Sequence, residues 1–429
     1  MSGIRRLLNT FAWQQRADLY IMILSTGVAS VITLLAQMSL SYLLPPATYG
    51  EVRLIHGYFL LVVPLVMLAL HAPLGRLCIR PDAENRWRLY WQVFIRRWWP
   101  LALLVTGMLG VLAASGILTQ KNALNLPLAL LFGALPVWAL LEFYQYFWKF
   151  TRARRRASLA LLLSKLGLKG GAVGGVLWWP TSYGFAAGFL VGGAGAWLAL
   201  RLLQKRFLQR LPLAPQAGLT SDEKSIVRRF LPMALLLNAL AAIALQLDAV
   251  FLDYMIADTK TAGLYGFALL FANAALLVQA PLAAYWLPEL GSYYEQGWRI
   301  FLRRIFLYQA ALTICVAGGA ILIYLIVPLV VPYFFSDAYI AALPLLPLLL
   351  VRVVVQSTFG VLSQGLFVAH AMRLNVVLTG VNILLTSYLS WLWIPGYGVE
   401  GLIYAKIISD ASLSLLAVMA VFYATRKMS

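Results

Sequence analysis

Charged residues inside apolar stretches are the feature of this sequence most able to do chemistry. Lys406 and Asp410 lie four residues apart in the run GLIYAKIISDASLSLL, which is typical of a membrane-spanning helix, so they share one helical face. A charge near the centre of a bilayer costs at least about 2.5–3.5 kcal/mol. The two residues could form an i,i+4 ion pair, or they could have separate roles in ligand binding and ion coupling.

Four other basic residues lie within predicted membrane helices. Lys165 and Lys169 share a face of one helix, about 12 and 18 Å from its end. Arg352 lies about 12 Å inside another helix, and Arg53 lies near the start of a third. Guanidinium and ammonium groups are the donors that bind phosphate, which makes these residues candidates for an anion site. The alternatives are interfacial lysines and an arginine paired with a carboxylate for structure.

Three carboxylates are embedded in the same way. They are Glu142, Asp248 and Asp410. A carboxylate in a low-dielectric environment can take up and release protons, so all three are candidates for coupling transport to an ion gradient. Structural pairing is the alternative for each of them. The three histidines show no metal-binding spacing, and no cofactor is expected apart from a proton or sodium gradient.

The composition excludes a soluble globule. Of the 429 residues, 62% are hydrophobic and 11% are charged, whereas a soluble domain is about half apolar and a quarter charged. Apolar stretches of about 20 residues recur along the whole chain, which is typical of an all-α polytopic membrane protein. Twelve spanning helices are predicted, at residues 19–41, 52–75, 98–118, 126–148, 157–178, 185–203, 231–254, 263–287, 305–331, 344–369, 375–394 and 400–424.

The basic residues follow the predicted topology. If both termini are cytoplasmic, 27 of the 34 Lys and Arg residues lie in cytoplasmic segments, and only Lys121 and Lys260 lie in outside loops. This distribution obeys the positive-inside rule, so most of the net charge of +19 reflects membrane orientation. Nucleic acid is therefore not expected as a partner.

Internal repeats indicate two halves of six helices each. The motif WPTSYG (Trp179–Gly184) recurs as WIPGYG (Trp393–Gly398), and the TYG ending at Gly50 has a counterpart in the TAG ending at Gly263. The offsets are nearly equal. They predict an N-terminal lobe at 1–203, a basic cytoplasmic linker at 204–230 and a C-terminal lobe at 231–429. A transporter built from repeats binds its substrate between them.

Several motifs resemble those of Wzx-type oligosaccharide flippases, which belong to the multidrug/oligosaccharidyl-lipid/polysaccharide (MOP) exporter superfamily. They are YLLPPATYGEVRLI, the segment that begins LDAVFLDYMIADTKTAGLYG, and GYGVEGLIYAKIISD. The resemblance implies a MATE-like, V-shaped pair of six-helix lobes in the bacterial inner membrane. It also implies transfer of undecaprenyl-pyrophosphate-linked oligosaccharides to the outer leaflet by alternating access, with membrane lipids and polysaccharide-assembly proteins as partners.

Such flippases are thought to have cationic central cavities, so the resemblance assigns the pyrophosphate to the embedded basic residues. These are Arg53, Lys165, Lys169, Arg352 and Lys406. Within this hypothesis Lys406 helps to hold the pyrophosphate, and Asp410 competes for Lys406 when the site is empty.

Two other functions have different sequence requirements. A cation-coupled multidrug exporter of the same fold predicts an acidic cavity, and drug-exporting relatives often carry an acid inside the first helix, where this chain has only Asp18 at the helix entry. A polysaccharide polymerase or ligase predicts a large outside loop, but no predicted outside loop exceeds about a dozen residues. The sequence contains no P-loop motif for ATP hydrolysis. We therefore expect a transporter, not an enzyme.

Overall fold

The computed structural model describes residues 2–78, 80, 83–151, 153–209, 211, 218–256, 258–369 and 371–426. The side chains of residues 2–19, 280, 284, 285, 287, 288 and 426 lie outside this description. All regular secondary structure in the described residues is helical, which confirms the predicted all-α class. The α-helices are α1 (Ser2–Leu43), α2 (Pro46–Met67), α3 (His71–Cys78), α4 (Trp87–Ala114), α5 (Asn122–Phe132), α6 (Leu135–Phe150), α7 (Arg154–Lys165), α8 (Gly171–Trp178), α9 (Ser182–Gln209), α10 (Ser221–Met255), α11 (Thr259–Ala274), α12 (Gln279–Gln296), α13 (Trp298–Phe334), α14 (Leu345–Ser357), α15 (Gly360–Val368) and α16 (Met372–Arg426).

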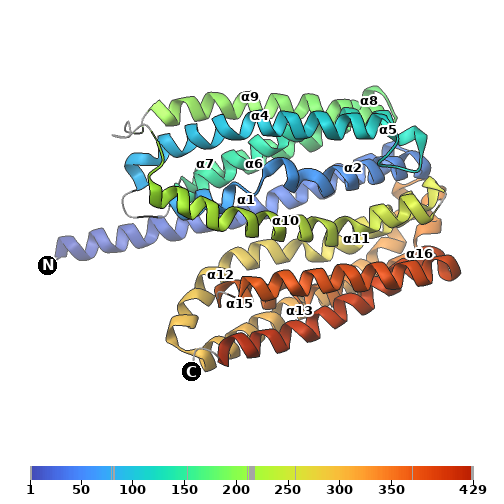
Figure 1. Cartoon of the computed structure of the whole chain (residues 1–429). Coiled ribbons are helices and arrows are strands. Elements are labelled where there is room, and N and C mark those ends of the chain that lie inside the picture. The colour runs from blue at the N-terminus through green and yellow to red at the C-terminus, as the bar shows by residue number, and fades with distance from the viewer. Residues whose placement is uncertain are drawn as a thin grey trace.

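The number of spanning segments agrees with the sequence once two irregular helices are considered. Within the described ranges, ten helices are long and apolar enough to cross a membrane, and the pair α5–α6, bent by 44°, makes eleven. As one straight helix, the 55 residues of α16 would extend over about 80 Å, more than twice the thickness of a bilayer core. Its backbone turns at Gly398, where φ is 57°, and the chain reverses direction there (Figure 1). The two halves of α16 correspond to the last two of the twelve predicted segments.

The helices form two groups in space. Figure 1 shows α1–α9 on one side and α11–α16 on the other, with α10 between them. Helix α2 packs against α10 and α11, and α10 also packs against α16. We call α1–α9 the N-terminal half and α10–α16 the C-terminal half. The first helix begins and the last helix ends at the same end of the bundle, which requires an even number of crossings.

Most helices begin earlier than predicted from the sequence, and the difference is large for α1, α4 and α10. Helix α4 begins at Trp87 and not at residue 98, and α10 begins at Ser221 and not at residue 231, inside the predicted linker. The start of α10 is a capping box in which Thr220 and Glu223 exchange hydrogen bonds. The remainder of that linker lies in part outside the described residues.

Glycines set the close packing of α8 against α9. A Cβ atom on Gly171 would lie 2.4 Å from the carbonyl oxygen of Gly188, and one on Gly175 would lie 2.1 Å from that of Gly184. No other residue allows the two backbones to approach so closely. The chain enters α8 through a π-helical turn at Leu166–Gly170, which carries Lys169. This turn brings Lys169 into the interior of the N-terminal half, where the residue is 5% exposed.

Candidate functional site

A cavity of ≈ 240 Å³ lies between the two halves. Arg53 and His56 of α2 line one wall, and Asp248 of α10, Tyr265 of α11 and Arg352 of α14 line the other. The structure therefore brings together residues from widely separated parts of the chain, among them three of the predicted site residues. Arg352 and Asp248 are each 6% exposed, so their charges are largely removed from water.

Asp248 is the centre of a charge cluster in the C-terminal half. Its Oδ2 atom lies 2.7 Å from Nη1 of Arg352, and its Oδ1 atom lies 3.3 Å from Nζ of Lys406. The hydroxyl of Tyr265 donates a hydrogen bond of 2.5 Å to Oδ2 and accepts one of 2.5 Å from Nη1 of Arg352. Four helices therefore meet at one carboxylate, which compensates two buried cations.

The structure distinguishes between the two alternatives for Lys406, an ion pair with Asp410 or separate roles. Among the described residues, Lys406 and Asp410 form no ion pair. Lys406 turns toward α10, where Nζ donates a hydrogen bond of 2.7 Å to the carbonyl of Ala244 as well as pairing with Asp248. Asp410 instead accepts a hydrogen bond of 3.3 Å from the amide of Asn382 in the first half of α16. Lys406 faces α10 and Asp410 faces the first half of α16, so the two side chains have separate partners.

Three embedded basic residues of the N-terminal half, Arg53, Lys165 and Lys169, have no carboxylate that compensates their charge in this way. Within the described part of the chain, no carboxylate lies within ion-pair distance of Arg53, Lys165 or Lys169. Nζ of Lys169 lies 3.0 Å from Nε2 of His56. Nζ of Lys165 lies 5.3 Å from the ring centroid of Trp138, within the range of a cation–π interaction. Arg53 lines the central cavity and Lys165 lines the neighbouring one, and no described carboxylate of this half lines either, so this wall carries excess positive charge.

Two further cavities extend the central one along the interface. A cavity of ≈ 350 Å³ shares Gln37 and Asn273 with the central cavity and is also lined by Lys165. A third, of ≈ 410 Å³, shares Thr26 and Leu161 with the second. Together they form a path that leads toward the end of α6.

The third cavity is lined by Glu142 and Lys149, so we call this end of the bundle the Lys149 end. Glu142 and Lys149 share the cavity but form no ion pair in the described structure. The predicted carboxylates thus have three different environments. Asp248 is paired with two cations, Asp410 is bonded to a neutral amide, and Glu142 faces a cavity.

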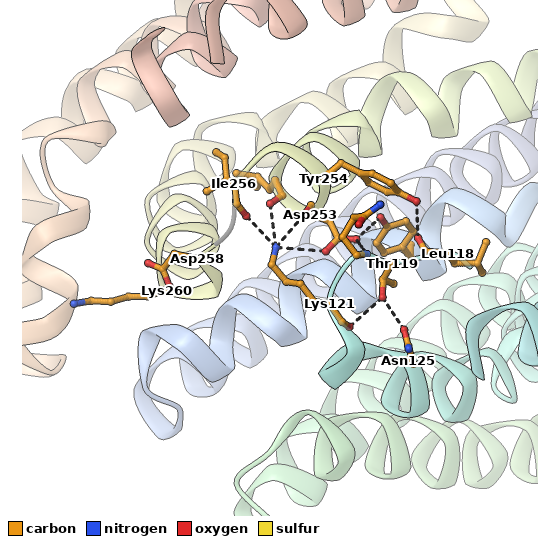
Figure 2. Close-up of polar contacts among 12 residues, drawn as sticks. Leu118, Thr119, Lys121, Asn125, Asp253, Tyr254, Ile256, Asp258 and Lys260 are labelled. Atoms are coloured by element: carbon orange, nitrogen blue, oxygen red, sulfur yellow. Dashed lines mark hydrogen bonds and ion pairs between the residues drawn. The ribbon is translucent and has the colours of Figure 1, made fainter. Parts of the chain in front are cut away.

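At the opposite end, which we call the Lys121 end, polar contacts join the two halves. Nζ of Lys121 lies 3.4 Å from Oδ1 of Asp253 and donates hydrogen bonds of 3.1–3.2 Å to the carbonyls of Leu252, Asp253 and Ile256 (Figure 2). Asp253 Oδ2 also accepts hydrogen bonds from the hydroxyl of Tyr58 (2.8 Å) and the backbone N–H of Gln120 (3.2 Å). We call Tyr58, Gln120, Lys121 and Asp253 the interhalf latch.

Backbone contact closes the same end. A Cβ atom on Gly50 of α2 would lie 1.9 Å from the carbonyl oxygen of Thr259, and one on Gly263 of α11 would lie 1.8 Å from that of Pro46. These glycines end the TYG and TAG motifs, which the sequence analysis interpreted only as traces of a repeat. The motifs also pack against each other across the interface. No space for a ligand remains where they meet.

The interhalf latch was not predicted from the sequence. Lys121 was placed in an outside loop, and Asp253 was given no role. The one available signal was that Lys121 and Lys260 are the only basic residues in the predicted outside loops. That signal could not show that Lys121 reaches the C-terminal half.

Comparisons with known proteins show the fold. No protein-family model and no curated protein matches the chain. An inward-facing multidrug-resistance MATE transporter of the MOP superfamily aligns with a TM-score of 0.73 at 14% identity, over 95% of this chain and 99% of the other. An outward-facing MATE transporter aligns with a TM-score of 0.59 at 13% identity, over 95% and 96%.

A third similar structure is a MOP-superfamily transporter from Pyrococcus furiosus, described as having a binding pocket of reverse polarity that suggests a different function. It aligns with a TM-score of 0.67 at 13% identity, over 96% of this chain and 95% of the other. The chain therefore has the fold of MATE transporters and is a multi-pass membrane protein, as its apolar helices also indicate.

Proposed function

We propose that this protein is a flippase for undecaprenyl-pyrophosphate-linked oligosaccharides, which it moves from the cytoplasmic to the outer leaflet of the bacterial inner membrane. The observation that carries the proposal is the charge of the cavity wall. Arg53, Lys165 and Arg352 line the central and second cavities, where Asp248 is the one carboxylate among the described lining residues. Lys169 contacts His56 and Lys406 pairs with Asp248, so these two cations lie directly behind the wall. A buried cation without a counter-ion is costly, and the phosphates of a bound substrate would supply the missing negative charge.

The cavities also suit alternating access. The path is hollow from the centre toward the Lys149 end, whereas the interhalf latch and the glycine contact close the Lys121 end. If the Lys149 end is cytoplasmic, as the basic residues predict, this arrangement admits a substrate from the cytoplasm. The two termini then also lie in the cytoplasm.

An ion gradient is the energy source that we propose, with Asp410 as the first candidate for coupling. Asp410 is 8% exposed and forms no ion pair within the described structure, so no ion pair has to break when its carboxylate binds or releases an ion. Asp248 is held by two cations, and Glu142 is exposed to the third cavity. Either a proton or a sodium ion could be the coupled ion.

A cation-coupled multidrug exporter is the second candidate. It is favoured by one observation, the presence of both Glu142 and the aromatic residue Tyr146 in the lining of the third cavity. An acid beside an aromatic ring is suited to an organic cation. The central cavity, however, carries the opposite polarity.

The test uses a strain deleted for the gene, in which the sidedness of lipid-linked sugar is followed by lectin or periodate labelling of spheroplasts. We expect intact repeat units to accumulate on the cytoplasmic leaflet, with rescue by the wild-type chain. Arg53→Gln and Lys165→Gln should fail to rescue, whereas the matched control Lys260→Gln, at an exposed residue in the first turn of α11, should rescue fully. Delivery of repeat units to the outer leaflet in the deleted strain, with loss of drug resistance alone, would support the drug exporter instead.

A further inference from the structure

The donors of the central cluster are only partly used by Asp248. Arg352 contacts the carboxylate through Nη1 alone, and its buried Nε has no hydrogen-bond partner within the described residues. Asp248 Oδ1 likewise lacks a hydrogen bond and is held only by the ion pair with Lys406. A guanidinium that serves a purely structural pair usually presents two N–H groups to the carboxylate. In this end-on geometry the Nε–H group of Arg352 remains available to another acceptor.

The cluster is also accessible from the cavity. Asp248, Tyr265 and Arg352 line the same cavity as Arg53 and His56, which face them from the N-terminal half. A ligand that enters the cavity therefore meets Asp248 and Arg352 directly, and Lys406 lies behind Asp248. The carboxylate occupies the position in which an anion would contact both Arg352 and Lys406.

We infer that Asp248 is the resident counter-ion of this site and that an entering phosphate group displaces it from Arg352 and Lys406. The inference rests on the proposed function and identifies the residue that opposes substrate binding. A carboxylate has two oxygens, and both are used within the C-terminal half. A phosphate of a pyrophosphate has further oxygens, which can reach Arg53 across the cavity. Displacement thus replaces an interaction within one half by one that joins the two halves.

The consequence for binding differs from that of a structural ion pair. While Asp248 holds the two cations, only the fraction of molecules in which it has moved away can bind an anion, and the apparent affinity is lowered by that fraction. Removing the charge of Asp248 should therefore strengthen anion binding. It should also slow transport, because the carboxylate no longer assists release of the phosphate.

The experiment measures pyrophosphate binding to the purified full-length chain in lipid nanodiscs by calorimetry. We expect Asp248→Asn to bind at least about ten-fold more tightly than the wild type, while its flipping rate in proteoliposomes falls. The matched control is Glu289→Gln, which removes a part-buried carboxylate that is bonded to Tyr308 and lines none of the three cavities. It should change the affinity less than about two-fold.

An unchanged or weaker affinity of Asp248→Asn would overturn the inference, and so would an equal gain in Glu289→Gln, since general electrostatics would then explain both. Should Asp248→Asn fail to fold, Lys406→Gln is compared with Lys406→Gln/Asp248→Asn, and the double variant should bind more tightly. Pyrophosphate binding by the wild type without a gain in the variants rejects only the displacement. Absence of any binding to the wild type would contradict the proposed function as well.

Discussion

Removing the side-chain charge of Lys121 should open the end of the bundle that the interhalf latch closes. Lys121 Nζ makes one ion pair and three hydrogen bonds to the C-terminal half, and the side chain of Asp253 is fully buried. In Lys121→Gln these contacts are lost, but Asp253 keeps its hydrogen bonds from Tyr58 and Gln120. The loss is therefore that of a charge-assisted hydrogen bond, about 1.5–3 kcal/mol, and not that of a wholly unpaired charge.

This free energy applies to the difference between two conformations. When the Lys121 end is open, water solvates both groups, so the variant destabilises only the closed form. A difference of 1.5–3 kcal/mol changes the ratio of closed to open molecules about ten- to hundred-fold. If closed wild-type molecules outnumber open ones by a similar factor, Lys121→Gln should contain comparable amounts of the closed and open forms.

The assay is a distance measurement between spin labels at Ala123 and Ala338, which are exposed residues of the two halves at the Lys121 end. Cys78 and Cys315 are first replaced by serine. The wild type should give mainly short distances, and Lys121→Gln should add a population at longer distances. Lys260→Gln serves as the control for loss of a lysine at the same end. A distance distribution in Lys121→Gln that matches the control would refute the assignment of the latch.

Three further changes test the packing and the coupling. Gly263→Val places a Cβ 1.8 Å from a carbonyl oxygen of α2, so it should hold the Lys121 end open and produce the same long distances even with Lys121 intact. Gly171→Val pushes α8 away from α9 and should lower the free energy of unfolding by about 1–3 kcal/mol. Gly174→Val should not lower it, because a Cβ there meets no atom within 4 Å. Equal losses in the two variants would contradict the role of Gly171 in close packing. Asp410→Asn should flip substrate at a rate that no longer responds to a proton or sodium gradient in proteoliposomes, and a retained response would exclude Asp410 from coupling.

The sequence by itself determined the elements and their environment. Apolar runs of about 20 residues have a length that suits only a membrane helix, and this local property predicted the twelve segments. Two separate segments were predicted for the region of α16, and the structure divides this helix at Gly398, a glycine with positive φ. The close packing of α8 against α9 is also a local property, because only glycine, which has no side chain, allows two backbones to touch in an apolar setting.

The tertiary structure decided the partners of the embedded charges. Spacing along one helix placed Lys406 beside Asp410, but the packing of α10 against α16 gives Lys406 to Asp248, 158 positions earlier in the chain. The contact of Lys121 with Asp253 depends in the same way on how the two halves meet. An ion pair between helices is a property of their relative rotation and height, which packing of the whole bundle sets. A helix carries its own periodicity in its sequence, whereas it does not carry the identity of the neighbour that its charged face meets.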